Sequence, residues 1–397
     1  MVLIEALSGN QAAAWGAKIA RVQAVIAFPI TPQSELVTTL ASMINEGELK
    51  AGYLSPDGEH SVMAALVGAS TTGVRAFTGS CGQGISFMTE NIYIAAGKRV
   101  PVVMAIPNRS LAQPGGPRSG NCDSMLLRDS GWMQFYCEDN QEILDTIIQA
   151  YKVAEDKRVY LPAQVMYEGW GLAQTTMPVI IPDQEEVDKF LPPYKHEWYS
   201  MEPLHGKSPR EYGDDAQQGR YNIGQALENA KIVIKEVNEE YGKRFGRRYG
   251  NGLIEKYKCD GAKVAMITMG SITGTAKDVI DEMNEKGEPI GLVKIRSFRP
   301  FPTKDLEEAI KDFEAIGVLT RNNPYGAIGA GIEFREIAAT LYSLKKRPLI
   351  IGFHTSIGRY TTIQQMRCIA KKVLKAYETG KVENEVEWIW KNGEVIK

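Results

Sequence analysis

Four short segments carry residue types that can bind a ligand or act on it: residues 28–34, 55–61, 78–84 and 107–123. In the first of them, Pro29 and Pro32 restrict the backbone around Thr31 and give its hydroxyl and neighbouring backbone groups a fixed direction. The same residues can also form an ordinary turn into a helix, with Gln33 or Ser34 as its cap. The first segment therefore allows a ligand contact at Thr31 and a purely structural role.

The second and third segments offer a carboxylate and a glycine-rich turn. Glu59 stands where a helix is about to start, so it can contact a ligand or interact favourably with the positive end of that helix. The run Thr78-Gly-Ser-Cys-Gly-Gln-Gly84 has three glycines, which let the backbone approach a flat ligand closely. Its spacing fits neither a dinucleotide fingerprint nor a P-loop. Cys81 within it is either a reactive thiol or a small residue in a tight turn.

The fourth segment is the longest of these loops and contains two arginines. Arg109 can form a bidentate pair with a substrate carboxylate, and the glycines and prolines at residues 114–117 can let the loop move as a lid. A mobile surface loop without a binding role is the alternative. Arg118 adds a second cation for a more anionic substrate or for a phosphate group.

The elements that must position these loops alternate between helix-period stretches and short β-branched runs. An Ala-rich helix at 11–20, with Asn10 as its cap, is followed by expected strands at 22–28, 74–78, 100–106 and 159–165. Each strand leads through a loop to a helix pattern, which is typical of a parallel sheet covered on both faces. Ligands bind such sheets at the carboxyl ends of the strands, where the four segments lie.

A second alternating unit follows a long interruption of Pro-rich and charged sequence at 181–219 and a charged helix at 221–245. Its expected strands are 264–269, 290–295, 315–319 and 349–353, with helices starting at Thr273, Thr303 and Ile332. We therefore expect a first domain at 1–180, a connector and long helix at 181–258, a smaller domain at 259–378 and a tail at 379–397. The connector can also wrap a neighbouring subunit.

Composition narrows the class of function. The chain has 397 residues, with 46 Lys and Arg against 48 Asp and Glu, so its formal charge of −2 gives no general attraction to nucleic acid or to anionic membranes. The first residues lack a targeting pattern and no stretch is apolar enough to span a membrane, which favours a cytoplasmic protein. Five dispersed cysteines and four histidines fit neither a cluster nor a zinc site, so we expect no metal on this chain.

Taken in order, several motifs resemble those of the alpha subunit of pyruvate:ferredoxin oxidoreductase and its relatives. The motifs are Pro29-Ile-Thr-Pro32, Gly58-Glu-His-Ser61, Gly82-Gln-Gly84, Asn108-Arg109, Arg128-Asp-Ser-Gly-Trp-Met-Gln134, Met269-Gly-Ser271 and Arg299-Pro-Phe-Pro302. The resemblance covers nearly the whole chain. It implies an α/β fold in which a doubly wound parallel-sheet domain that binds the pyrimidine of thiamine diphosphate precedes a smaller, transketolase C-terminal-like α/β domain.

The resemblance also implies roles for named residues. In that family the acidic residue matching Glu59 hydrogen-bonds the pyrimidine ring of thiamine diphosphate and so assists removal of the cofactor's reactive proton. Pro29 and the run Gly82, Gln83 and Gly84 would contact the cofactor, and Thr31 and Arg109 would bind the substrate carboxylate. Glu59, Arg109 and Thr31 are accordingly the expected catalytic residues.

The same resemblance implies that the active site is shared. The Gly-Asp-Gly motif with a later Asn that holds Mg²⁺ and the diphosphate is missing, so it is expected on a beta subunit, and the 4Fe–4S clusters are expected on beta, gamma or delta-type partners. The chain alone should then be inactive. The complex would oxidise pyruvate to acetyl-CoA and CO₂ with coenzyme A, and would pass electrons to ferredoxin or another low-potential acceptor.

The sequence leaves alternatives for the substrate and for the role of the chain. The loop at 111–121 departs from the usual pyruvate pattern and looks more like that of the phenylglyoxylate and oxalate oxidoreductases. Against oxalate, the position that carries an extra arginine in that branch is Thr31 in this sequence. For the role of the chain, a non-catalytic scaffold subunit and a transketolase-like enzyme without electron transfer stay open.

Overall fold

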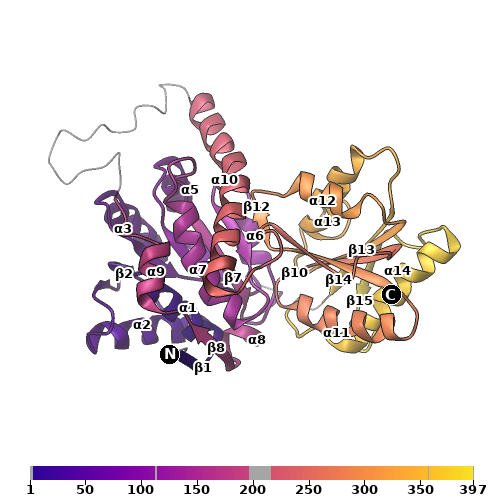
Figure 1. Cartoon of the computed structure of the whole chain (residues 1–397), viewed down its shortest axis with the longest axis horizontal. Coiled ribbons are helices and arrows are strands. Elements are labelled where there is room, and N and C mark those ends of the chain that lie inside the picture. The colour runs from indigo at the N-terminus through magenta and orange to yellow at the C-terminus, as the bar shows by residue number, and fades with distance from the viewer. Residues whose placement is uncertain (1–2, 112–113, 196–215, 356, 397) are drawn as a thin grey trace.

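The computed structural model describes residues 3–111, 114–195, 216–355 and 357–396. Figure 1 shows two lobes side by side, each built around a sheet, with the long helix α10 (Ala216–Phe245) standing along the first lobe. The sequence predicted this helix from residue 221, and it begins five residues earlier than that. Residues 196–215, the middle of the expected connector, lie outside the described residues.

The first lobe contains a seven-stranded sheet with the order β12-β6-β7-β5-β4-β2-β3. Its strands are β2 Ala24–Ile26, β3 Gly52–Leu54, β4 Ala76–Gly79, β5 Val103–Asn108, β6 Met133–Tyr136, β7 Ala163–Glu168 and β12 Ser297–Arg299. Neighbouring strands are parallel except for the pair β12 and β6. The expected parallel α/β sheet is confirmed.

All four strands predicted for this sheet begin later than the sequence predicts, and the delay is largest for two of them. The runs expected from residues 100 and 159 become β5 and β7, which start at Val103 and Ala163. Arg99 and Tyr160 have φ angles of 58° and 39°, a left-handed backbone that a strand does not contain. The chain therefore turns at each of these residues before it enters the sheet.

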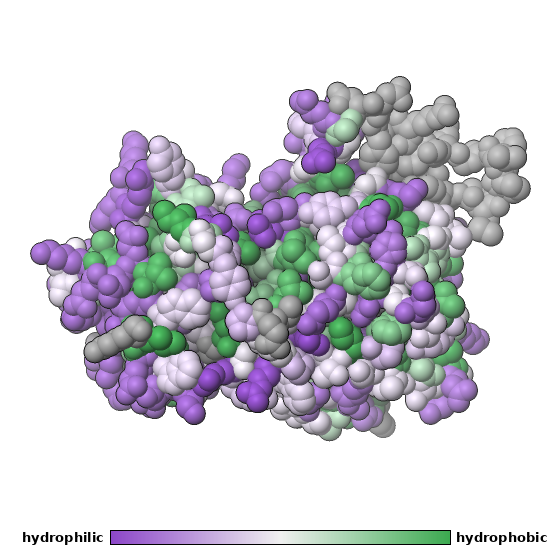
Figure 2. All heavy atoms as spheres, turned by 180° about the vertical axis from the view of Figure 1, so that it is seen from behind, coloured by the Kyte–Doolittle hydropathy of each residue, from purple (hydrophilic) through white to green (hydrophobic). Residues whose placement is uncertain are grey.

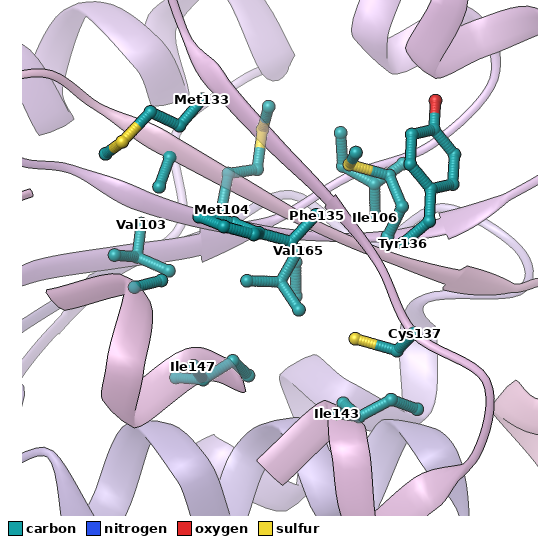
Figure 3. Packing of buried hydrophobic residues seen from close by; sticks show 14 of the residues in the cluster. Val103, Met104, Ile106, Met133, Phe135, Tyr136, Cys137, Ile143, Ile147 and Val165 are labelled. Carbon is teal, nitrogen blue, oxygen red and sulfur yellow. The ribbon is translucent and has the colours of Figure 1, made fainter. Parts of the chain in front are cut away.

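Helices pack around this sheet in two groups, since α1 contacts both α2 and α7, and α3, α4 and α5 contact one another. The helices of the lobe are α1 Gly9–Ile19, α2 Ser34–Asn45, α3 Glu59–Thr71, α4 Gln83–Phe87, α5 Thr89–Gly97, α6 Cys122–Leu126, α7 Asn140–Ala154, α8 Gly171–Gln174 and α9 Gln184–Phe190. Figure 3 shows Ile143 and Ile147 of α7 pointing at the apolar side chains of β5, β6 and β7. Burial of these apolar surfaces is the main force that holds helix to sheet.

Three local features of the first lobe differ from the prediction. Ser8, rather than Asn10, caps α1 in a capping box with Gln11. The strands β1 (Leu3–Leu7) and β8 (Met177–Ile181) form a separate antiparallel pair that the sequence did not reveal. In the expected connector, α9 forms because Asp183 accepts hydrogen bonds from two backbone N–H groups at its start.

The second lobe contains a six-stranded sheet with the order β15-β14-β13-β10-β11-β9. Its strands are β9 Ile254–Tyr257, β10 Val264–Met269, β11 Ile290–Ile295, β13 Ala315–Thr320, β14 Leu349–Thr355 and β15 Val386–Ile389, and its helices are α11 Ile272–Glu285, α12 Thr303–Ile310, α13 Gly331–Tyr342 and α14 Ile363–Thr379. The four strands predicted for this unit are confirmed within two residues at each end. Among these six strands, only β9 runs antiparallel to its neighbour.

A buried ionic cluster joins the two lobes. Lys294 of β11 and Arg296 directly after it both contact Glu142 of α7, at 2.7 Å and 3.0 Å. All three side chains are no more than 2% exposed. Although burial opposes ionisation of Glu142, the two cations hold its pKa below the ordinary value. Separating the lobes would leave buried charges unpaired, so the cluster fixes their relative position.

The surface of the molecule mixes polar and apolar residues. On the face in Figure 2, hydrophobic residues lie in small groups between hydrophilic ones, as on an ordinary protein surface. None of the described helices combines the length and the apolar character needed to cross a membrane.

His354 of β14 gives the stability of the second lobe a pH dependence. Its side chain is buried, its ring lies 4.2 Å from that of Trp388, and burial lowers its pKa to about 4. An unfolded histidine takes up a proton near pH 6.5, so the folded state is expected to lose stability as the pH falls from about 6.5 to about 4. The loss is at most about 3 kcal/mol, and above about pH 6.5 it is absent.

Urea unfolding at a series of pH values, for the wild type and for His354→Phe, measures this contribution. Buried Glu333, whose pKa burial raises to about 7, acts with the opposite sign, because its stabilisation is lost as the pH rises from about 4.5 to about 7. The difference between the two proteins removes that common contribution. The two stability profiles should diverge below about pH 6.5, and parallel profiles would show that His354 is not the titrating group.

Candidate active site

The candidate site lies at the carboxyl ends of β2, β3, β4 and β5, where four loops leave the same edge of the parallel sheet. Gln33 links two of them, because its amide nitrogen donates to the carbonyl of Gly79 at 2.9 Å. Asn10 of α1 supports the first loop, since its amide donates to the carbonyl of Pro32 at 2.9 Å. Both side chains are fully buried, so their hydrogen bonds hold the loops firmly.

Glu59 lies at the base of the site as the first residue of α3. Its side chain is buried at 8% exposure, and no described residue hydrogen-bonds its carboxylate. Gly84 faces it so closely that a Cβ there would lie 2.6 Å from Oε1 of Glu59 and would also meet Oγ of Ser80. A larger residue at Gly84 would displace the carboxylate of Glu59. The Glu59 carboxylate can therefore accept a hydrogen bond from a ligand, and the backbone at Gly84 beside it carries no side chain. This arrangement suits a flat, polar ring.

Arg109 directly follows β5, and its side chain packs against Gly82, which belongs to the same turn as Gly84. A Cβ at Gly82 would come 2.6 Å from its Nε, and Gly82 has a φ of 53°, which favours glycine. The guanidinium donates to the carbonyl of Thr31 at 2.6 Å and to Oε1 of Gln83 at 2.8 Å, while its buried Nε has no partner. Among the described residues, no carboxylate forms an ion pair with it. A buried cation without an anion is costly, which favours an anionic ligand.

The structure places Thr31 beside Arg109 through its backbone rather than its hydroxyl. The Thr31 carbonyl accepts from Arg109 and from Sγ of Cys81, and its side chain is exposed, like Pro29 at the rim. Gln83, expected as a cofactor contact, orients Arg109. Burial raises the pKa of the Cys81 thiol well above its ordinary value, which agrees with a small residue in a tight turn and not with a reactive thiolate.

The long loop after β5 is held by the second lobe. Asn121 donates its backbone N–H to the carbonyl of Arg321 at 2.9 Å, and Gly358 donates to the carbonyl of Ser119 at 2.6 Å. Arg321 also forms a buried ion pair with Glu168 at 2.8 Å. These contacts hold the described end of the loop near Ser119 and Asn121 against the second lobe, and the movement of residues 114–117 as a lid stays a prediction.

A cavity of about 860 Å³ lies between this loop and the second lobe. Three cations line it, Arg118, Arg359 and Lys391, and none of them has an ion pair with a described carboxylate. Trp170 and Tyr360 supply aromatic surface. The cavity is therefore suited to an anionic ligand larger than a 2-oxoacid.

One buried residue of the site was not predicted from the sequence. Asp123, at the start of α6, lies beneath Gly82 and Arg109 and accepts hydrogen bonds from both of their backbone N–H groups. The available signal was an acidic residue directly after a glycine and proline loop, at a helix start. No group of three or more His, Cys, Asp or Glu side chains suited to a metal ion occurs in the part of the chain that the structure describes.

Two family models match the chain. Residues 15–239 match the thiamine-diphosphate-binding domain of pyruvate flavodoxin/ferredoxin oxidoreductase, and residues 262–366 match core domain II of pyruvate:ferredoxin oxidoreductase. The first match covers the loops with Thr31, Glu59, Gly82 and Arg109, and the second covers most of the second lobe.

Curated relatives match over nearly their full length. Pyruvate synthase subunit PorA of Pyrococcus furiosus is 40% identical over 400 residues, covering 100% of both chains, and PorA of Methanocaldococcus jannaschii is 42% identical over 95% of this chain and 96% of its own. Ketoisovalerate oxidoreductase subunit VorA of Pyrococcus abyssi is 41% identical over 96% of both. Identity therefore does not separate the two substrate classes.

Two solved structures share the fold. A 2-oxoglutarate:ferredoxin oxidoreductase from Magnetococcus marinus, with 2-oxoglutarate, coenzyme A and succinyl-CoA bound, superimposes with a TM-score of 0.71 at 18% identity. The match covers 94% of this chain and 65% of that longer one. A split-gene transketolase gives a TM-score of 0.53 at 13% identity, over 94% of this chain and 98% of its own.

Proposed function

Because this chain belongs to the alpha subunits of thiamine-diphosphate-dependent 2-oxoacid:ferredoxin oxidoreductases, we propose that it binds the pyrimidine half of the cofactor at Glu59 and the substrate carboxylate at Arg109. The observation that carries the proposal is that two buried side chains of opposite type, Glu59 and Arg109, lack the partners that such groups normally have. Glu59 lacks a hydrogen-bond donor among the described residues, and the guanidinium of Arg109 forms no ion pair with a described carboxylate. They lie against Gly84 and Gly82, two residues apart in one turn.

The residues at this turn fit the cofactor's pyrimidine ring. Glu59 would accept a hydrogen bond from a ring nitrogen, Gly82, Gln83 and Gly84 would border the ring with backbone, and Pro29 would lie at its rim. Bound thiamine diphosphate supplies a carbon nucleophile for the 2-oxo group. Glu59 acts by stabilising the protonated ring nitrogen, which makes removal of the reactive proton easier. Arg109 holds the substrate carboxylate and Thr31 borders it.

Pyruvate is the substrate we propose, with acetyl-CoA and CO₂ as products. It is supported by the resemblance of Thr31 and Arg109 to the pyruvate enzymes and by the pyruvate synthase relatives. The ketoisovalerate oxidoreductase relatives support a branched 2-oxoacid as the alternative substrate. The sequence motifs did not indicate this alternative. Phenylglyoxylate and oxalate rank below both.

Partner chains complete the proposed enzyme. Beta-type subunits would supply Mg²⁺ and the diphosphate site, and beta, gamma or delta-type subunits the 4Fe–4S clusters that pass electrons to ferredoxin. Coenzyme A would enter as the second substrate. The cavity with Arg118, Arg359 and Lys391 has the size and the positive charge for its phosphates, which supports this assignment.

A substrate panel on the natively purified complex tests the proposal. Reduction of a low-potential dye is followed with pyruvate, 2-oxoisovalerate, phenylglyoxylate, 2-oxoglutarate and oxalate, each with and without coenzyme A. Activity highest on pyruvate and dependent on coenzyme A is expected. Higher activity on 2-oxoisovalerate would replace the proposed substrate, and a complex inactive with every oxoacid would favour the scaffold role.

A further inference from the structure

We propose that Asp123 is a positioning residue that sets the substrate-binding arginine and the glycine turn relative to each other. The inference rests on the proposed function and adds a residue to it. It does not place Asp123 in contact with substrate or cofactor. Asp123 acts instead through Arg109 and Gly82.

The contacts of Asp123 are unusually complete. One carboxylate oxygen, Oδ2, accepts from the N–H of Gly82 at 2.8 Å and from the N–H of Arg109 at 3.0 Å. The other, Oδ1, accepts from the amide of Asn108 at 2.8 Å and from the N–H of Ser124 at 2.9 Å. The side chain is fully buried. Four N–H donors around one carboxylate offset much of the cost of burying its charge.

These contacts connect two strands of the sheet. Gly82 follows β4, whereas Arg109 follows β5, and the two are 27 positions apart in the chain. A single oxygen atom bridges them, so the backbone of Arg109 cannot move away from the turn without breaking a buried hydrogen bond. At its other end the Arg109 side chain is held by Thr31 and Gln83. Arg109 is thus fixed at both ends, and Asp123 supplies the backbone end.

The contact also fixes the turn that faces Glu59. Gly82, whose N–H donates to Asp123, has a left-handed φ. Gly84, two residues later, lies against the side chain of Glu59. Because both proposed binding groups depend on this turn, a shift of Asp123 would displace one against the other. A displacement of about 1 Å in a binding group can reduce activity strongly.

Asp123→Asn is the test, because it keeps the shape and removes the second acceptor. Whichever way the amide is turned, its NH₂ group faces two N–H donors, so at least two hydrogen bonds are lost. In the assembled complex we expect the KM for the 2-oxoacid to rise about 10-fold or more and kcat/KM to fall about 10- to 100-fold. An unchanged KM and kcat/KM would overturn the proposal.

A matched control separates positioning from general stability. Asp145 is another fully buried aspartate, which contacts Tyr241, Arg247 and Tyr249 away from the turn. Asp145→Asn should lower the melting temperature and leave the KM unchanged. If wild-type and Asp145→Asn complexes oxidise the 2-oxoacid, the proposed function stands, and a normal KM in Asp123→Asn then overturns the positioning role alone.

A double-mutant cycle identifies the route of the effect. With Arg109→Lys already present, Asp123→Asn should lower kcat/KM by less than about threefold, because the group it positions is gone. Additive effects would overturn the proposal. If Asp123→Asn does not assemble, Asn108→Ala carries the test, since it removes one donor and leaves the Asp123 carboxyl in place. A KM increase of about 3- to 10-fold is then expected, and an unchanged KM overturns the role.

Discussion

Replacing Glu59 with glutamine is expected to lower kcat of the assembled enzyme by about two to four orders of magnitude. Glutamine has nearly the same shape, so the fold and the close contact with Gly84 are preserved. The neutral amide, however, stabilises a protonated ring nitrogen far less than a carboxylate does. The measurement is steady-state dye reduction with saturating 2-oxoacid and thiamine diphosphate.

Glu90→Gln serves as the control for Glu59→Gln. Glu90 lies in the first turn of α5, its side chain is 76% exposed, and its carboxylate lies near the ring of His60. Its replacement should leave kcat within about twofold of the wild type. A complex that keeps normal turnover with Glu59→Gln would contradict the thiamine role and would favour a scaffold subunit.

The second large effect is expected for Arg109→Ala, which should lower kcat/KM for the 2-oxoacid by about two to three orders of magnitude, mainly through a higher KM. The substrate carboxylate would enter a buried site without a cation, and loss of one partner of a buried charge pair costs about 3 to 5 kcal/mol. The Thr31 carbonyl and Gln83 would also lose their donor.

Arg109→Lys tests whether geometry matters in addition to charge. Lysine keeps the positive charge but cannot donate to Thr31 and Gln83 and also present a planar pair of N–H groups to a carboxylate. Its kcat/KM should lie between those of the wild type and of Arg109→Ala. If Arg109→Ala left the KM for every 2-oxoacid unchanged, another residue would have to bind the carboxylate.

The fold was predictable where each element carries a strong local pattern. Strands β10, β11, β13 and β14 are largely apolar runs between charged or glycine-containing stretches, and the sequence placed them almost to the residue. Strand β3 was missed because all three of its residues are exposed and show no alternation. Strand β12 was missed because it pairs with β6, more than 160 positions earlier, and such a contact leaves no local signal.

The candidate site was predictable in its parts more than in its arrangement. The sequence selected the loops that contain Thr31, Glu59, Gly82 and Arg109, since strand ends rich in glycine, proline and charge are typical ligand sites. The roles of these residues stay predictions. Asp123 was missed because three of its four donors, from Gly82, Asn108 and Arg109, come from other loops and strand ends that reach it only in the folded chain. A buried carboxylate is recognised by such contacts, which a sequence does not display.

The two lobes contribute unequally to the proposed chemistry. All proposed cofactor and substrate contacts at the glycine turn come from the first lobe, whereas the second lobe anchors the long loop through Arg321 and Gly358. The buried contacts of Glu142 with Lys294 and Arg296 hold that anchor in place. The second lobe therefore contributes by holding the long loop in position.

Dye reduction with and without partner subunits decides whether this chain provides the pyrimidine half of a shared thiamine diphosphate site. Reduction of a low-potential dye by a 2-oxoacid is followed for the purified chain alone and for the complex with its partner subunits, each with and without added thiamine diphosphate and Mg²⁺. We expect activity only in the complex that contains the cofactor. Turnover by the isolated chain, or by a complex stripped of thiamine diphosphate, would contradict it.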